Sequence, residues 1–109
     1  MAYDEGAAER IREWFGDRPG VVEKKMFGGL SFMLAGNLCC GVLGDTLLAR
    51  IGPEQHAAAL ARPHARVMDF TGRPMKGYIV VGPAGFETDA ELAEWLSLSL
   101  AYVQTLPPK

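Results

Sequence analysis

Three short apolar runs separated by two tight-turn signals most strongly constrain the fold of this 109-residue chain. The runs are residues 30–34, 38–43 and 46–51, and the turn signals are Gly36-Asn37 and Gly44-Asp45. A glycine beside Asn or Asp between two apolar runs favours a two-residue β-hairpin turn. The pattern therefore predicts an antiparallel meander of three strands.

The first strand of this meander is expected to be long, from about Glu23 to Ala35. Gly28-Gly29 lies inside it, and glycine within a strand often marks a kink or a bulge. A turn between two shorter strands is the alternative. We favour the single long strand.

Two helices are expected around the meander. Residues 4–16 place apolar side chains at helical spacing, with Asp4 as the N-cap and Arg18-Pro19-Gly20 as the stop. Trp14 and Phe15 are expected to anchor it in the core. Gly52-Pro53 opens a short helix, because proline suits the first helical position, and Pro63 ends it.

A longer helix is predicted from about Asp89 to Gln104. Thr88 and Glu91 have the spacing of a capping box. The predicted buried face consists of Leu92, Trp95, Leu96, Ser99 and Val103. Leu98, Ala101 and Tyr102 widen the apolar surface beyond that stripe, which indicates either a deeper core or a subunit contact. A homodimer through Leu98 and Tyr102 is one such contact.

Two further strands, residues 66–70 and 76–81, complete the pattern. The predicted order is α-β-β-β-α-β-β-α, with a mainly antiparallel sheet and the helices on one face. This is an α+β fold in a single domain that spans residues 1–109.

The charge distribution argues against a dedicated DNA-binding protein. Residues 1–20 and 86–109 are net acidic, whereas residues 21–85 carry seven Lys or Arg against four acidic residues. A DNA-binding protein usually shows a strong basic patch and a recognition helix. We therefore expect no direct DNA binding by this chain alone.

The sequence predicts a cytoplasmic location. No apolar stretch reaches the roughly 20 residues that cross a bilayer, and the start of the chain does not resemble a signal peptide. Cys39 and Cys40 are adjacent and have no other partner, so no structural disulfide is expected. In a strand they would point to opposite faces, one into the core and one partly exposed. A redox role for them is the lesser alternative.

The patterns of common catalytic sites do not occur. His56 and His64 lie eight positions apart without a metal-binding motif, and both are expected on the surface. Residues 82–85 lack the lysine of a phosphate-binding loop, and the acidic residues near position 90 belong to a helix start. We expect neither an enzyme nor a metal or other cofactor.

Two segments, residues 24–29 and 69–78, combine Lys or Arg with glycine and large apolar residues. Their cations are candidate contacts for a ligand or a partner: Lys24, Lys25, Arg73 and Lys76. Their other residues are expected to shape the loops: Phe27, Gly28, Gly29, Asp69, Phe70, Gly72, Pro74 and Gly77. Glycine here indicates positive φ or a close backbone approach. The alternative is a purely structural loop, in which Asp69 pairs with Arg73 or Lys76.

Residues 24–30 and 68–78 resemble the hallmark segments of the TfoX/Sxy N-terminal domain family, and the likeness extends over nearly the whole chain. This resemblance implies an α+β fold related to that of type III secretion chaperones. It also implies a link to bacterial transcription regulation. The founding members are competence regulators that work with the cyclic-AMP receptor protein and carry a second, helical C-terminal domain. That domain is not expected in these 109 residues, so the competence role is not expected to transfer.

Three functional hypotheses follow. The first is a non-enzymatic interaction module that binds another protein through the Arg73–Lys76 loop and the face around Leu98 and Tyr102. The second is a sensor of a small anionic ligand or nucleotide that uses Lys24, Lys25, Arg73 and Lys76 as a clamp. The third, and weakest, is an enzyme that acts on RNA or a nucleotide.

Overall fold

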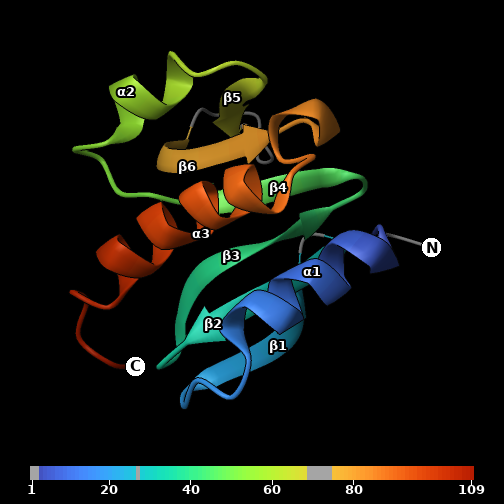
Figure 1. Ribbon diagram of the computed structural model, residues 1–109. Helices are drawn as coiled ribbons and strands as arrows, with labels where there is room; N and C mark the ends of the chain where they lie inside the picture. The colour runs from blue at the N-terminus through green and yellow to red at the C-terminus, as the bar shows by residue number, and fades with distance from the viewer. Residues whose placement is uncertain (1–2, 27, 69–74) are drawn as a thin grey trace.

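The computed structural model describes residues 3–26, 28–68 and 75–109 of the chain (Figure 1). The elements, in order, are α1 (Glu5–Phe15), β1 (Val21–Met26), β2 (Gly29–Leu34), β3 (Asn37–Leu43), β4 (Thr46–Arg50), α2 (His56–Leu60), β5 (Ala65–Met68), β6 (Met75–Val81), the 3₁₀ turn η1 (Pro83–Gly85) and α3 (Asp89–Val103). The predicted α+β class is confirmed. Among the described residues, no helix is long and apolar enough to cross a membrane.

All six strands form one antiparallel sheet in the order β1-β2-β3-β4-β6-β5. Figure 1 shows α1 and α3 side by side over the sheet, with α2 beside β5 and β6. Side chains from all three helices share one buried cluster with the strands. The helices therefore pack on one face, as the sequence predicts.

The first strand of the meander differs from the prediction. It is two strands, because Met26 pairs with Gly29 and the hairpin reverses between them. Gly28 has φ +75°, a conformation that glycine adopts without strain and a strand interior does not provide. The expected long strand from Glu23 to Ala35 is wrong, and the turn left as the alternative is what forms. The sheet thus gains one strand.

The two predicted hairpin turns have different outcomes. Gly44-Asp45 links β3 to β4, with Leu43 opposite Thr46, as expected. The preceding turn lies one residue earlier than predicted, at Ala35-Gly36, where φ is +51° and +84°. Positive φ at both central positions is typical of a type I′ turn. Asn37 instead begins β3, and its side-chain amide donates to the carbonyl of Pro107 at 2.9 Å.

The helix ends are close to the predictions. Asp4 caps α1, but the helix ends at Gly16, whose φ of +55° stops it before Arg18-Pro19-Gly20. Thr88 and Glu91 form the predicted capping box of α3. The short helix begins later than expected, at His56, because the residues after Gly52-Pro53 form turns first.

Two apolar clusters lie on opposite faces of the sheet. The larger one, under the helices, contains the predicted buried face of α3 together with Ile11 and Phe15 of α1. Trp14 packs against it but is only partly buried. The smaller cluster on the other face is built on Leu38, Leu48 and Met68. Side chains alternate across a strand, so neighbouring residues such as Leu47 and Leu48 supply the two clusters.

Candidate functional site

The structure does not bring the described candidate cations into one cluster. Lys24 and Lys25 are exposed on β1, and Lys76 is exposed on β6. Strands β2, β3 and β4 lie between them, which at the usual strand spacing amounts to about 19 Å. Arg73 lies outside the described residues. The described part of the chain therefore gives no support to an anion clamp built from Lys24, Lys25 and Lys76.

The loop-shaping residues can be checked at three glycines. Gly28 and Gly77 have positive φ, of +75° and +91°. Gly29 allows a close approach, since a Cβ there would lie 2.1 Å from the carbonyl oxygen of Val42. The predicted reasons for glycine are thus present at these positions. The remaining predicted residues, Phe27, Asp69, Phe70, Gly72 and Pro74, lie outside the described residues.

Gly77 joins β6 to the segment that follows β4 through hydrogen bonds of its backbone, and we call this contact the crossing at Gly77. Its carbonyl accepts hydrogen bonds from the amides of Ile51 and Gly52, at 2.9 and 3.1 Å. Its own amide donates to Nδ1 of His56 at 2.9 Å. The prediction that His56 is a surface residue is therefore wrong, since the ring is half-buried and bonded, whereas His64 is exposed as expected. This crossing fixes the path of residues 51–55.

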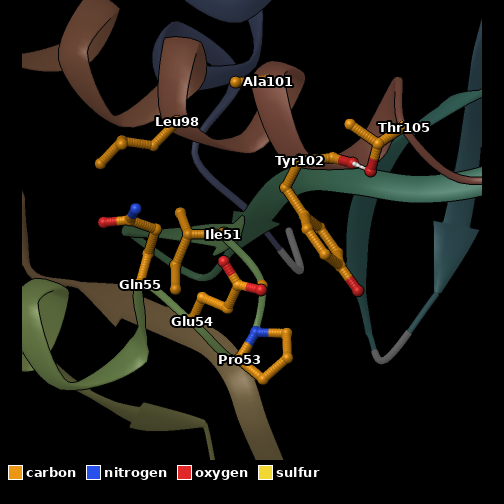
Figure 2. A pocket seen from close by; sticks show the side chains of 9 residues that line it. Ile51, Pro53, Glu54, Gln55, Leu98, Ala101, Tyr102 and Thr105 are labelled. Atoms are coloured by element: carbon orange, nitrogen blue, oxygen red, sulfur yellow. Dashed lines mark hydrogen bonds between the residues drawn. The ribbon is translucent and has the colours of Figure 1, made fainter.

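That path forms one wall of a pocket, and the C-terminal half of α3 forms the other (Figure 2). The pocket has a volume of about 420 Å³. It is lined by Ile51, Gly52, Pro53, Glu54, Gln55, Leu98, Ala101, Tyr102 and Thr105. The three residues predicted to widen the apolar surface of the last helix, Leu98, Ala101 and Tyr102, all lie in it. Sequence reasoning missed residues 51–55, for which Gly52-Pro53 was the only signal.

Tyr102 is held in place on several sides. Its ring packs so closely on Gly52 that a Cβ at that glycine would lie 2.4 Å from Cδ1 of the ring. Its backbone carbonyl accepts a hydrogen bond from Oγ1 of Thr105 at 2.6 Å. The guanidinium of Arg50 lies 5.7 Å from the centre of the Tyr102 ring and 5.3 Å from that of Tyr78. Cation–π contacts of this kind orient an aromatic ring, so this wall of the pocket is preformed.

A second, shallower hollow lies on the outer surface of α3 and adjoins the pocket at Leu98. It has a volume of about 640 Å³ and is lined by Arg62, Ala90, Ala93, Glu94, Ser97 and Leu98. Leu98 lines both hollows. Arg62 forms an ion pair with Glu94 and stacks over Trp95, with 4.4 Å from its guanidinium carbon to the ring centre. We call the two hollows together the α3 groove.

A third hollow lies beside α1, and charged residues form part of its lining. Nε and a terminal nitrogen of Arg12 donate to the carboxylate of Glu23 at 2.6 and 2.9 Å, and Arg12 also bonds Glu9. The hydrogen bonds from Arg12 lower the pKa of Glu23 below its ordinary range. The Arg12–Glu23 ion pair therefore forms part of the lining of this hollow.

The cysteines do not point to opposite faces. Both Cys39 and Cys40 are fully buried in the larger cluster, as free thiols. The strand pairing shifts there, since Phe32 faces Cys40 while Met33 faces Leu38, and this leaves Cys39 as the extra residue of a β-bulge. The hydrogen bond with Cys40 lowers the pKa of Cys39, whereas burial raises the pKa of Cys40 well above its usual range.

Comparison with known proteins identifies the family. The model of the TfoX N-terminal domain matches residues 13–103, which is most of the chain. The match includes β1, β6, the crossing at Gly77 and all residues that line the α3 groove except Thr105. No curated protein and no solved structure matches the sequence. Among the described residues, no group of three or more His, Cys, Asp or Glu side chains is placed to hold a metal ion.

Proposed function

Since the chain belongs to the TfoX N-terminal domain family, we propose that it is a non-enzymatic regulatory module of the cytoplasm that acts by binding another protein. The binding surface is the α3 groove. The occupant is a segment of the partner that places an apolar side chain against Leu98 and Tyr102.

The observation that carries this proposal is the continuity of the two hollows through Leu98. A small molecule is usually enclosed by one concave pocket. An elongated groove along the outer surface of a helix instead fits a protein segment that places successive side chains in successive hollows. The lining supports this occupant, because aromatic anchors such as Tyr102 contribute strongly to protein interfaces.

The uncharged α3 side of the first hollow points the same way, although Glu54 on the facing wall and Arg62 and Glu94 in the second hollow are charged. From Trp95 to Pro108 the chain has no charged residue, although Ala101 is exposed and Leu98 and Tyr102 are only half-buried. The centres of protein interfaces are depleted in charge, whereas free surfaces are rich in it. A charge-free stretch at the surface is therefore consistent with a face that another protein covers.

Site-specific photo-crosslinking tests this proposal. A photoreactive amino acid replaces Ala101 in the groove, and a matched variant carries it at Ala84, an exposed alanine of η1. We expect one discrete protein adduct from position 101 that is absent from position 84 and lost when Leu98→Asp is added. Equal adducts from both positions, or none from position 101, would reject the groove as the binding surface.

A second copy of the chain is the other occupant that this experiment can reveal. An adduct with the mass of two chains would identify it, and light scattering across protein concentration would then show a dimer that Ala101→Arg disrupts. That result would replace the heterologous partner with self-association through the last helix.

A further inference from the structure

The edge strand β1 offers a second surface. It lies at the opposite edge of the sheet from β5. Within the part of the chain that the structure describes, β1 pairs with β2 alone, over residues 21–26. In an antiparallel strand, every other residue turns its N–H and C=O away from its one neighbour. Such an open row of donors and acceptors is a template for an additional strand. The other edge, β5, is shorter, with four residues.

The side chains of β1 give this edge a distinct character. Glu23 is bound to Arg12 on the helix-bearing face, so its negative charge is compensated. Lys24 and Lys25 are exposed, and within residues 3–26, 28–68 and 75–109 neither forms an ion pair. Val22 is 61% exposed and is the one exposed large hydrophobic residue in the described part of the chain. The edge therefore presents two positive charges and an apolar contact.

When a second copy pairs with β1 and has its helices on the same side of the sheet, a like-charge pair forms at the two-fold axis. Residues that face each other across antiparallel strands lie on the same face of the sheet. If both copies keep their helices on the same side, the longest registers place either Glu23 against Glu23 or Lys24 against Lys24 on the two-fold axis. Like charges directly opposite each other are destabilising. A strand with acidic residues opposite Lys24 and Lys25 has no such like-charge pair and matches the positive charge of this edge.

We propose that β1 binds an extended acidic segment of another protein as an added antiparallel strand. Lys24 and Lys25 point to opposite faces, so they require two consecutive acidic residues. Val22 shares the face of Lys24, so it requires an apolar residue two positions after the second acid. The ligand therefore reads acidic, acidic, any residue, apolar, within a β-prone peptide.

A peptide titration of the ¹⁵N-labelled full chain tests this inference. The probe is an extended peptide containing Glu-Glu-Thr-Val flanked by β-branched residues. We expect chemical-shift changes and slower amide exchange in residues 21–26. We also expect at least tenfold weaker binding to the variant with Lys24→Glu and Lys25→Glu. The matched control Lys76→Glu, on β6, should bind as the unchanged protein does.

A second probe separates strand addition from simple charge attraction. The same peptide with N-methylated backbone amides keeps its carboxylates but cannot donate the strand hydrogen bonds, so we expect its binding to be lost. Equal binding of the methylated peptide, equal weakening by Lys76→Glu, or no binding of the first peptide would each overturn the inference. The α3 groove is a separate surface, so Ala101→Arg should leave this titration unchanged.

Discussion

Gly77 is the residue on which the geometry of the groove most depends. Its φ of +91° is strained for any residue with a side chain, and a Cβ there would lie 3.1 Å from the carbonyl carbon of Gly52 and 3.2 Å from the nitrogen of Pro53. The three hydrogen bonds of its backbone fix residues 51–52 and the ring of His56. The groove wall is therefore held by a residue that does not line it.

We predict that Gly77→Ala lowers the free energy of unfolding by about 2 kcal/mol or more, since the left-handed conformation costs about 1–2 kcal/mol and crowding adds to it. The matched control is Gly44→Ala. Gly44 has φ +61° but nothing within 4 Å of a Cβ, so only the conformational cost applies. Urea unfolding of both variants measures the difference. Equal destabilisation would show that the close approach to Gly52 does not matter.

The Arg12–Glu23 pair predicts a pH dependence. The pKa of Glu23 is lowered in the folded protein by its hydrogen bonds with Arg12, so the stabilisation is present above the ordinary carboxylate range and is lost as the pH falls through the lowered value. Glu23→Gln should lower stability at neutral pH by at most about 1 kcal/mol, because the pair is solvent-exposed. The urea midpoint of Glu23→Gln should lie below that of the unchanged protein at neutral pH, and the two midpoints should converge at acidic pH. A gap that widens in acid would contradict this.

At the scale of elements, hairpin turns decide where sequence prediction succeeds. Gly44-Asp45 is found as predicted, because its signal and its register agree. The signal at Gly36-Asn37 is genuine but misplaced by one residue, since Asn37 is drawn into β3 by its bond to Pro107, a contact between distant parts of the chain. At Gly28 the sequence does not separate a hairpin turn from a kink or bulge, because these features share the same glycine signal.

The turn between β2 and β3 can be made more stable by a substitution at position 35. Ala35 has φ +51°, a conformation that Asn adopts more readily than Ala, and Asn-Gly is the preferred type I′ pair. We predict that Ala35→Asn raises the free energy of unfolding by about 0.5–1 kcal/mol. The following glycine must stay, because a Cβ at Gly36 would lie 2.7 Å from the carbonyl oxygen of Lys109. Thermal unfolding of variants at positions 35 and 36 checks both statements. A destabilised A35N protein would refute the turn assignment.

The cysteines illustrate a second limit of sequence prediction. Strand alternation places Cys39 and Cys40 on opposite faces, but the bulge at Cys39 turns both into the core. The bulged residue is not a glycine and so has no such signal in the sequence; this bulge is set by the pairing of β3 with β2. Of the candidate site, the sequence identified the apolar half on the last helix. The other half, residues 51–55, depends on the crossing at Gly77 and could not be predicted locally.

At the scale of the whole molecule, the buried thiols report on opening of the core. Both are fully buried, and burial raises the pKa of Cys40, which disfavours the reactive thiolate. We predict that a thiol-specific reagent labels the folded protein at least about a hundredfold more slowly than the urea-unfolded protein, because labelling requires opening. Absorbance of the released chromophore follows the reaction. Rapid labelling of one thiol in the folded protein would instead indicate an accessible, redox-capable site.

The two surfaces proposed for this molecule lie on different elements. The α3 groove runs along a helix packed on β3 and β4, whereas β1 is one of the two edge strands of the sheet. A module of this size can therefore contact two segments of one partner, or one segment each of two partners. Variants at Ala101 and at Lys24 with Lys25 separate these cases, because each changes one surface.

The most direct test of the central claim is the dissociation constant of the cross-linked partner for three purified proteins. These are the unchanged chain, Ala101→Arg in the α3 groove and Ala84→Arg on η1. We predict at least about tenfold weaker binding for A101R, equivalent to about 1.4 kcal/mol, and unchanged binding for A84R. Equal affinities for all three proteins would contradict the assignment of the α3 groove as the protein-binding surface.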